Sequence, residues 1–152
     1  MLASIRLDLF SLFYPLNHAL EVAIDPVLSD AKPVEHHILI VDDDPMMLEV
    51  VSMMVLSMGM SSSHAKDGLE AVEQYRTQGD RFSLVIMDVE MPVLDGIKAT
   101  QRIREIDPAA KVILCSGHTK QDVWKAKPNA YLLKPFLHMD LRETMHNLLR
   151  EE

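Results

Sequence analysis

Apolar and polar positions alternate in blocks from residue 36 onward. Four short apolar runs and one weaker, serine-rich run are each followed by turn residues and by a segment with apolar residues at helical spacing. A short apolar run bounded by turns is typical of a buried strand, and the three-to-four spacing is typical of an amphipathic helix. Strands that alternate with helices in this way predict an α/β fold with a doubly wound parallel sheet.

The predicted strands cover residues 37–41, about 60–65, 84–88, 111–115 and 130–133. The serines of the second strand are typical of a sheet edge. The predicted helices cover residues 45–58, a segment from 67, a segment from 95 to before Pro108, about 120–126, and a last segment to the chain end. We expect Asp44 and Asp95 to cap the helices that follow them.

Several side chains are expected in the core. The first helix carries five methionines and is apolar almost all round, which predicts that it is well buried. In the next two helices we expect the inward-facing residues to be Leu69, Val72, Tyr75, Ala99, Ile103 and Ile106. The single cysteine, Cys115, is interpreted as a small buried apolar residue.

Residues 1–34 differ from the rest of the chain. Leu2, Ile5 and Leu9 begin a helical pattern, and Pro26 and Pro33 are typical of a linker. The segment is interpreted as an N-terminal extension, with residues 35–152 forming the main domain. A docked helix, a disordered lead-in, residues from an unused upstream start and a membrane-surface or dimerisation helix stay open as alternatives. Asp8 argues against a secretory signal.

Composition excludes several classes of function. The net charge of −8 argues against direct, sequence-independent binding of nucleic acid, which needs a basic face. A single cysteine excludes a disulfide within the chain and leaves the cytoplasm as the default location. No apolar run reaches the roughly 20 residues that a membrane-spanning helix needs.

Chemically active side chains follow the predicted strands at their carboxyl ends, where open α/β sheets bind ligands. These residues are Asp42 and Asp43 after the first strand, Asp88 at the end of the third, Ser116 after the fourth and Lys134 after the fifth. Carboxylates suit a hard cation such as Mg²⁺. With a metal, a carboxylate can act as the nucleophile that forms an aspartyl phosphate, while a lysine and a hydroxyl hold phosphoryl oxygens.

The motifs ILIVDDDP, LVIMDVEMPVLDG, VILCSG and AYLLKPF together resemble the receiver domain of two-component response regulators, of the chemotaxis-regulator type. The resemblance covers about residues 35–150 and implies a flavodoxin-like sheet with strand order 2-1-3-4-5. It implies that Asp88 is the phosphoacceptor and that Asp42 and Asp43 are the metal pair, with Asp43 favoured as the direct ligand. The backbone carbonyl of Glu90 would be a further Mg²⁺ ligand.

The resemblance also assigns the remaining site residues. Ser116 takes the position of the family's hydroxyl, Lys134 that of its lysine and Tyr131 that of its aromatic switch. Glu90 and His118 occupy positions that overlook the phosphorylation site and are expected to modulate hydrolysis of the acyl phosphate. The bond between Lys134 and Pro135 is expected to be cis.

The sequence therefore predicts a single-domain response regulator that catalyses only its own phosphorylation and dephosphorylation. A sensor histidine kinase or a histidine phosphotransfer protein would donate the phosphate, and an output protein would read the result by direct contact. Two alternatives are a receiver that acts as an unphosphorylated scaffold and an aspartate-nucleophile phosphatase of the haloacid-dehalogenase kind. The phosphatase is disfavoured because its nucleophile belongs to the first strand.

Only 17 residues separate Ser116 from Lys134, as positions 117–133 show. This gap must hold a loop, the fourth helix and the fifth strand, so we expect that helix to be cut to one or two turns around residues 120–126. Trp124 is expected to anchor it, and Pro128 prevents its extension. A shortened fourth helix would reduce the family's dimerisation surface and favour a monomer.

Overall fold

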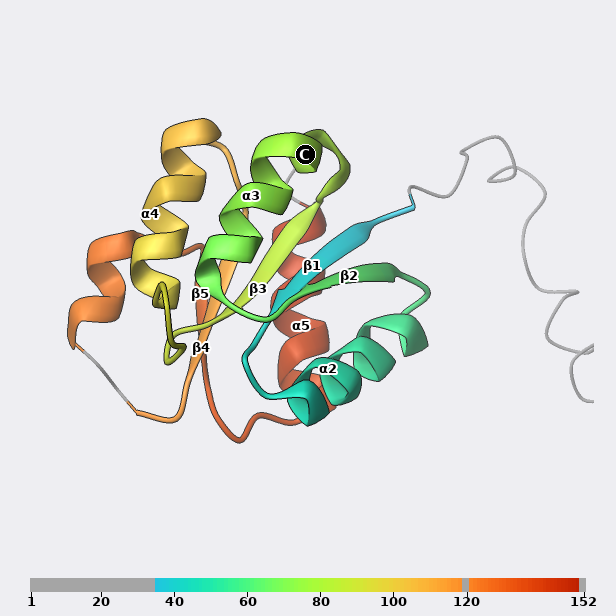
Figure 1. Cartoon of the computed structure of the whole chain (residues 1–152). Coiled ribbons are helices and arrows are strands. Elements are labelled where there is room, and N and C mark those ends of the chain that lie inside the picture. Colours follow the sequence, from blue (N-terminus) through green and yellow to red (C-terminus); the bar gives the residue numbers. More distant parts are fainter. Residues whose placement is uncertain (1–34, 119–120, 151–152) are drawn as a thin grey trace, which may run out of the picture. The chain divides into compact units, whose positions relative to one another are not determined.

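Five parallel strands form the centre of the structure, a computed structural model that describes residues 35–118 and 121–150 (Figure 1). The sheet has the order β2-β1-β3-β4-β5, which confirms the predicted topology. The strands are β1 (His37–Val41), β2 (Ser61–Ala65), β3 (Leu84–Asp88), β4 (Val112–Ser116) and β5 (Ala130–Leu133). The predicted extension, residues 1–34, lies outside the described residues, and the prediction for it stays a prediction.

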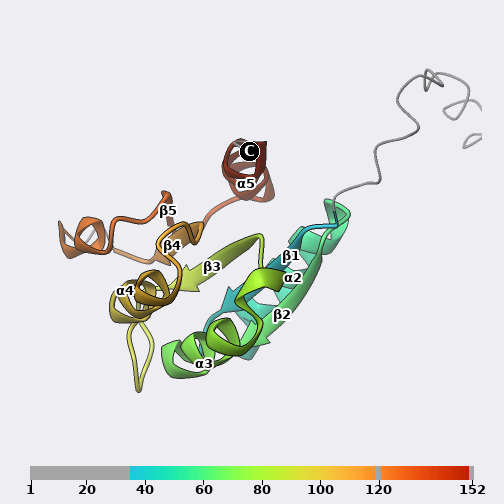
Figure 2. The same cartoon turned by 90° about the horizontal axis from the view of Figure 1, so that it is seen from above.

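Helices cover both faces of the sheet (Figure 2). One face packs against α2 (Pro45–Ser57) and α5 (His138–Arg150). The other packs against α3 (Gly68–Gln78), α4 (Gly96–Ile106) and the short 3-10 helix η5 (Gln121–Ala126). A further 3-10 turn, η4 (Gly79–Arg81), follows α3. No helix in the described part of the chain is long and apolar enough to cross a membrane.

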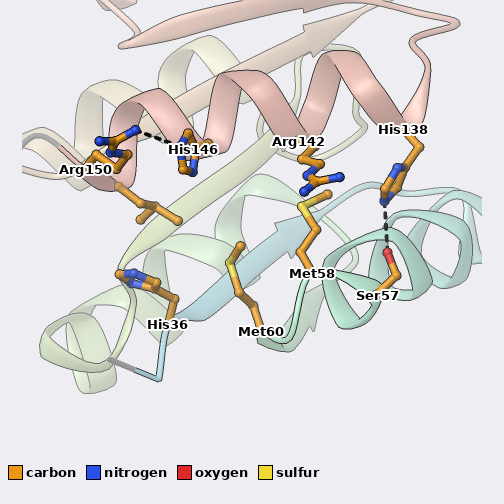
Figure 3. A pocket seen from close by; sticks show the side chains of 9 residues that line it. His36, Ser57, Met58, Met60, His138, Arg142, His146 and Arg150 are labelled. Carbon is orange, nitrogen blue, oxygen red and sulfur yellow. Dashed lines mark hydrogen bonds between the residues drawn. The ribbon is translucent and has the colours of Figure 1, made fainter. Parts of the chain in front are cut away.

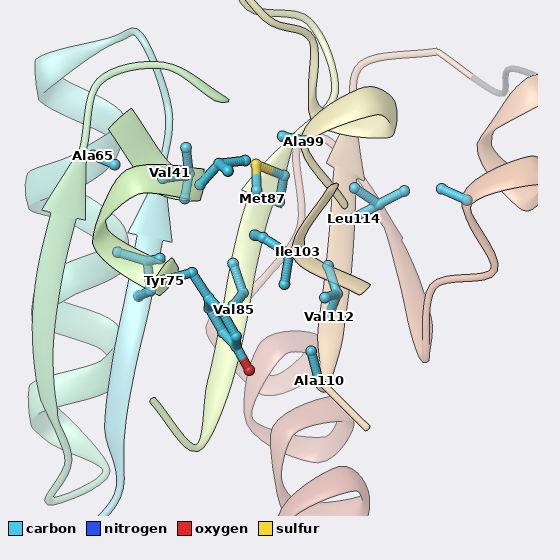
Figure 4. Close-up of a cluster of buried hydrophobic side chains, with 14 of the residues drawn as sticks. Val41, Ala65, Tyr75, Val85, Met87, Ala99, Ile103, Ala110, Val112 and Leu114 are labelled. Atoms are coloured by element: carbon cyan, nitrogen blue, oxygen red, sulfur yellow. The ribbon is translucent and has the colours of Figure 1, made fainter. Parts of the chain in front are cut away.

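The three central strands are buried along their whole length because both of their faces are covered. Alternate residues point to opposite faces. Leu39, Val85 and Leu114 join the core beneath α3 and α4 (Figure 4), whereas their chain neighbours Ile40, Ile86 and Ile113 join the core beneath α2 and α5. The continuous apolar runs of the sequence follow from this two-sided burial.

The edge strand β2 is polar, as the serine-rich sequence predicted. Among the described strands it pairs with β1 alone, and His37 of β1 connects to it through Ser61 Oγ at 2.6 Å and Ser63 Oγ at 2.8 Å. Burial lowers the pKa of His37, and the charge of Arg81 lowers it further. The neutral imidazole can therefore bridge the two hydroxyls.

Both predicted caps are present. The Asp44 side chain accepts a hydrogen bond from the Met46 backbone N–H at 2.9 Å, and Asp95 accepts one from that of Lys98 at 2.9 Å. Each carboxylate thereby satisfies a backbone donor that the first helical turn leaves without a partner.

The expectation that α2 is well buried is wrong. Met46, Met53 and Leu56 are exposed at 70%, 64% and 69%, and only Val51 and Val55 of this helix are fully buried. A helix that lies on one face of a sheet buries a single stripe, so apolar residues all round do not imply burial all round. For the same reason Leu69 of α3 and Ile106 of α4 are exposed, although both were expected to face inward.

The helix that connects β4 to β5 is short, as predicted. Of the residues expected to form it, Lys120 lies outside the described residues, and Gln121–Ala126 form η5. The expectation that Trp124 anchors it is wrong, because Trp124 is 62% exposed while Val123 and Ala126 are buried. In a 3-10 helix residues three apart lie on the same side, so Val123 and Ala126 face the core together and turn Trp124 outward.

Candidate functional site at the carboxyl ends of the strands

Five side chains predicted from the sequence lie at one edge of the sheet. Val41 pairs with Met87, so Asp42 and Asp88 follow at adjacent positions on β1 and β3. Asp88 pairs with Cys115, which places Ser116 one residue beyond it on β4. The Lys134 N–H donates to the Ser116 carbonyl at 2.8 Å and so joins the ends of β4 and β5. Parallel pairing alone brings these residues together.

A glycine lets the next helix begin directly over Asp88. A Cβ atom on Gly96 would collide with the Asp88 carbonyl oxygen and crowd the Met87 side chain. Only glycine therefore allows the start of α4 to approach the end of β3 so closely. The Asp95-Gly96 pair, which the sequence showed as a turn signal, also determines how the end of β3 at Asp88 is packed.

Lys134 lies between two buried carboxylates. Its Nζ is 2.7 Å from Asp42 Oδ2 and 2.9 Å from Asp88 Oδ1. Asp42 and Asp88 are 6% exposed, so water screens these pairs little. The sequence predicted that Lys134 lies near Asp88, but it gave no sign that Lys134 would also form an ion pair with Asp42.

The site's charges are strongly coupled. Burial raises the pKa of Asp88; Lys134 lowers it, Asp42 and Asp43 raise it again, and the net shift is upward. Burial lowers the pKa of Lys134, but its hydrogen bonds with Asp42 and Asp88 outweigh burial, and its pKa is raised. The lysine is therefore held in its charged form. An additional cation near Asp88 would stabilise its carboxylate.

The donor set fits a divalent metal ion. One carboxylate oxygen from each of Asp42, Asp43 and Asp88 lies within 4.8 Å of the others. Asp43 is exposed, and within the described residues its carboxylate has neither a hydrogen bond nor an ion pair. An all-oxygen cluster with one solvent-facing member suits Mg²⁺, which keeps several of its waters.

The hydroxyls of Ser116 and Tyr131 meet at the carbonyl oxygen of His118. Ser116 Oγ donates to it at 2.9 Å and accepts from the His118 N–H at 3.1 Å. Tyr131 Oη donates to the same carbonyl at 2.7 Å. The sequence placed both hydroxyls near the site but could not show that one backbone carbonyl connects them.

Glu90 and His118 lie opposite each other beside the site. His118 Nδ1 is 3.3 Å from Glu90 Oε1, and the His118 side chain is 76% exposed. Glu90 follows Asp88 by two residues and His118 follows Ser116 by two, so the contact joins the loops after β3 and β4. The two residues predicted to overlook the site thus contact each other.

Two further expectations are confirmed next to the site. The Lys134–Pro135 peptide bond is cis. Cys115 is buried, and burial raises the pKa of its thiol to about 12. Such a thiol stays protonated and unreactive at neutral pH.

Comparison with known proteins identifies the family. The model of the response regulator receiver domain matches residues 38–146, most of the chain. The chain therefore belongs to the response regulator receiver domains of two-component signalling, as the sequence motifs implied.

Individual relatives share both the sequence and the fold. The chemotaxis protein CheY of Bacillus subtilis is 36% identical over 106 residues, which are 66% of this chain and 87% of that protein. A CheY-like receiver domain from Methanospirillum hungatei superposes with a TM-score of 0.73 at 25% identity, covering 77% of this chain and 95% of that one. CheY of Borrelia burgdorferi, solved with CheX, BeF₃ and Mg²⁺, gives a TM-score of 0.73 at 26% identity, with coverages of 76% and 90%.

Proposed function

We propose that the chain is a response regulator that accepts a phosphoryl group on Asp88, in the presence of Mg²⁺, from a sensor histidine kinase or a histidine phosphotransfer protein. The observation that carries the proposal is the position of Lys134, held between Asp42 and Asp88 beside the unpaired carboxylate of Asp43. A carboxylate nucleophile, a fixed cation and oxygen ligands for a metal are the groups that phosphoryl transfer to an aspartate needs.

In the transfer step, an Asp88 oxygen attacks the phosphorus atom, and the bond from phosphorus to the donor's imidazole nitrogen breaks. The electron pair stays on that nitrogen, which then takes up a proton. Lys134 has a partner in Asp42 throughout, so it can turn its third hydrogen-bond donor toward a phosphoryl oxygen without losing its position. Phosphoryl transfer is mainly a matter of position and electrostatics, and this lysine supplies both.

Mg²⁺ would be held by Asp43, by Asp42 and Asp88, and by the backbone carbonyl of Glu90. When bound, it neutralises the clustered carboxylates and the developing charge on the phosphoryl oxygens. Asp43 is the natural first ligand, because Asp42 already accepts from Lys134 Nζ and from the Asp44 N–H at 2.9 Å.

The shared carbonyl of His118 suggests how phosphorylation is transmitted. Ser116 would turn its hydroxyl from that carbonyl to a phosphoryl oxygen, which changes the surroundings of the Tyr131 hydroxyl on the same acceptor. Tyr131 packs against the core and against Trp124, with ring centroids 6.3 Å apart. A shift at Ser116 would thereby reach the exposed surface of η5.

Glu90 and His118 would tune the lifetime of the phosphorylated state. Their contact joins the loops after β3 and β4, which lie beside Asp88 and Ser116. Replacing one of them removes a charged or polar group next to the site, so hydrolysis of the acyl phosphate should change while the rate of its formation changes less.

The output of this protein would be contact with another protein in the cytoplasm rather than catalysis on a separate substrate. The six residues of η5 offer a small surface for self-association, so we expect the phosphorylated protein to stay monomeric. Light scattering before and after phosphorylation tests this expectation, and dimerisation through η5 would contradict it.

A phosphorylated histidine phosphotransfer protein, labelled with ³²P, provides the direct test. With Mg²⁺ the label should move to the wild-type protein and to Asp80→Asn, a control that changes an exposed carboxylate on η4, but not to Asp88→Asn. If a small acyl-phosphate donor and a panel of such histidine proteins all fail to label the wild type, the scaffold function replaces this proposal.

A further inference from the structure

A groove of about 400 Å³ opens between α5 and the segment where α2 ends and β2 begins (Figure 3). His36 and Met60, which line it, immediately precede β1 and β2, so the groove reaches the amino ends of these strands. The aspartate cluster lies at the carboxyl ends. The groove is therefore separate from the phosphoacceptor site.

The lining of the groove is basic in an acidic protein. No carboxylate lines it among the described residues, although the whole chain has a net charge of −8. Five of its lining residues have nitrogen-bearing side chains: His36, His138, Arg142, His146 and Arg150. The last four recur every fourth residue along α5 and so lie on one side of that helix.

Hydrogen bonds determine whether Nε2 donates or accepts in two of these histidines. Arg150 Nη1 is 3.1 Å from His146 Nε2, and a guanidinium can only donate, so Nε2 accepts and a neutral His146 carries its proton on Nδ1. The hydroxyl of Ser57 donates to the Met54 carbonyl at 2.6 Å, so it accepts from His138 Nε2 at 2.9 Å. His138 thereby ties α5 to α2 and closes one end of the groove.

Other donors along the groove have no partner. Arg142 forms no hydrogen bond or ion pair with any residue that the structure describes. His36 Nδ1 is buried and also has no partner there. Arg142 and Arg150 place two positive charges on the same side of α5, and no carboxylate lines the groove between them among the described residues. A bound anion would satisfy these groups.

The opposite wall of the groove is apolar and adaptable. Met58 and Met60 line it, Leu149 adds an apolar side chain from α5, and all three are partly buried against the core beneath α2 and α5. Methionine side chains adjust to irregular apolar shapes. The volume lies in the range of small-molecule sites.

We propose that this groove binds a small organic phosphate of nucleotide size. The phosphate chain would lie along α5, on Arg142, Arg150 and the Nδ1–H of His146, because guanidinium groups match phosphate oxygens in pairs. The apolar part would lie on the two methionines. The proposal does not depend on phosphorylation of Asp88, since none of its residues belongs to that site.

Calorimetric titration of the full chain without divalent metal tests the proposal, with ATP, pyrophosphate, adenosine and sulfate as probes. Omitting the metal keeps phosphate away from the aspartate cluster. ATP should bind most tightly, pyrophosphate more weakly, and adenosine and sulfate weakest. Arg142→Gln and Arg150→Gln should each weaken ATP binding about tenfold, the loss expected for one charge-assisted hydrogen bond.

Arg102→Gln is the matched control, because it removes an exposed arginine on α4, on the other face of the sheet, and should leave ATP binding unchanged. The imidazole signals of His138 and His146 should shift in the NMR spectrum on ATP addition. Equal binding of ATP and sulfate, an equal loss in Arg102→Gln, or unshifted histidine signals would each overturn the proposal.

Discussion

The strand-end site and the connection between β4 and β5 are built in opposite ways. At the strand ends, Asp42, Asp88 and Lys134 are held by adjacent backbone positions in a rigid sheet and are largely buried. In the connection, η5 is held by the two small buried residues Val123 and Ala126, and its largest side chain is exposed. The difference separates a part fixed by backbone pairing from a part fixed by two buried side chains.

The strand-end site is held in place because the strands that carry it are buried on both faces of the sheet. In the connection between β4 and β5, few buried apolar contacts hold η5, so we expect η5 to be the more mobile part. Elements with few buried apolar contacts open at low free-energy cost, and switching segments are drawn from them. Tyr131 connects the two regions, because its hydroxyl reaches the His118 carbonyl while its ring lies against Trp124.

The largest effect is expected from Lys134→Met. Two buried carboxylates would lose their common cation, so the free energy of unfolding at neutral pH should fall by about 1 to 3 kcal/mol. Phosphorylation of Asp88 should slow by roughly 100-fold, as when one electrostatic group is removed from a transition state. Chemical denaturation and acetyl-phosphate kinetics measure both quantities.

We also expect the free energy of unfolding of Lys134→Met to depend on pH in a definite direction. Burial already raises the pKa of Asp88 in the wild type, and loss of Lys134 removes the main opposing influence. A carboxyl group with a folded-state pKa above its unfolded value stabilises the fold below the unfolded pKa, and that contribution is lost as the pH rises through the folded pKa. Lys134→Met should therefore recover stability on acidification. Lys98→Met, an exposed control, should differ little from wild type.

Next in size is the contrast between two neighbouring residues of η5. Val123→Ala should lower the free energy of unfolding by about 1 to 2 kcal/mol, because it leaves a cavity in the core. Trp124→Ala should change it by less than about 0.5 kcal/mol, as for most exposed positions. Thermal denaturation of both variants decides which residue anchors the connection. A larger loss in Trp124→Ala would restore the anchor expected from the sequence.

These two regions also differ in how far the sequence could predict them. Strand ends follow from hydrophobic runs and turn residues, and parallel pairing then fixes which polar residues meet, so Asp88, Ser116 and Lys134 could be placed together. The order of the sheet came from the family resemblance, and the structure agrees with it.

Details set by long-range packing could not be predicted. The exposed methionines of α2, the outward turn of Trp124 and the shared His118 carbonyl all depend on which side of a short element meets the sheet. Side-chain type carries no such information when an element is apolar all round or only six residues long.

A smaller effect is expected at Asp43. Asp43→Ala should abolish binding of Mg²⁺ but slightly raise the stability of the metal-free protein, because it removes one of three clustered negative charges. The adjacent Asp44→Ala is the matched control: it removes a helix cap, so it should lower stability by about 1 kcal/mol. Metal titration and melting curves compare the two, and a destabilised metal-free Asp43→Ala protein would contradict the assignment of the cluster.

The smallest effect is expected from deletion of residues 1–34. Both cores of the described domain are built from residues after 35, so the shortened chain should fold and accept phosphate at the rate of the full chain. Circular dichroism and phosphorylation kinetics test this domain boundary. A shortened chain that fails to fold would make the N-terminal segment part of the domain.

Identification of the phosphorylated residue tests the central claim most directly. After incubation with acetyl phosphate and Mg²⁺, mass spectrometry of the intact protein and of its peptides should show one phosphoryl group, on Asp88. The label should be absent without Mg²⁺ and absent in Asp88→Asn. Equal labelling of Asp88→Asn, or a phosphoryl group mapped to a residue outside the strand-end site, would contradict the account.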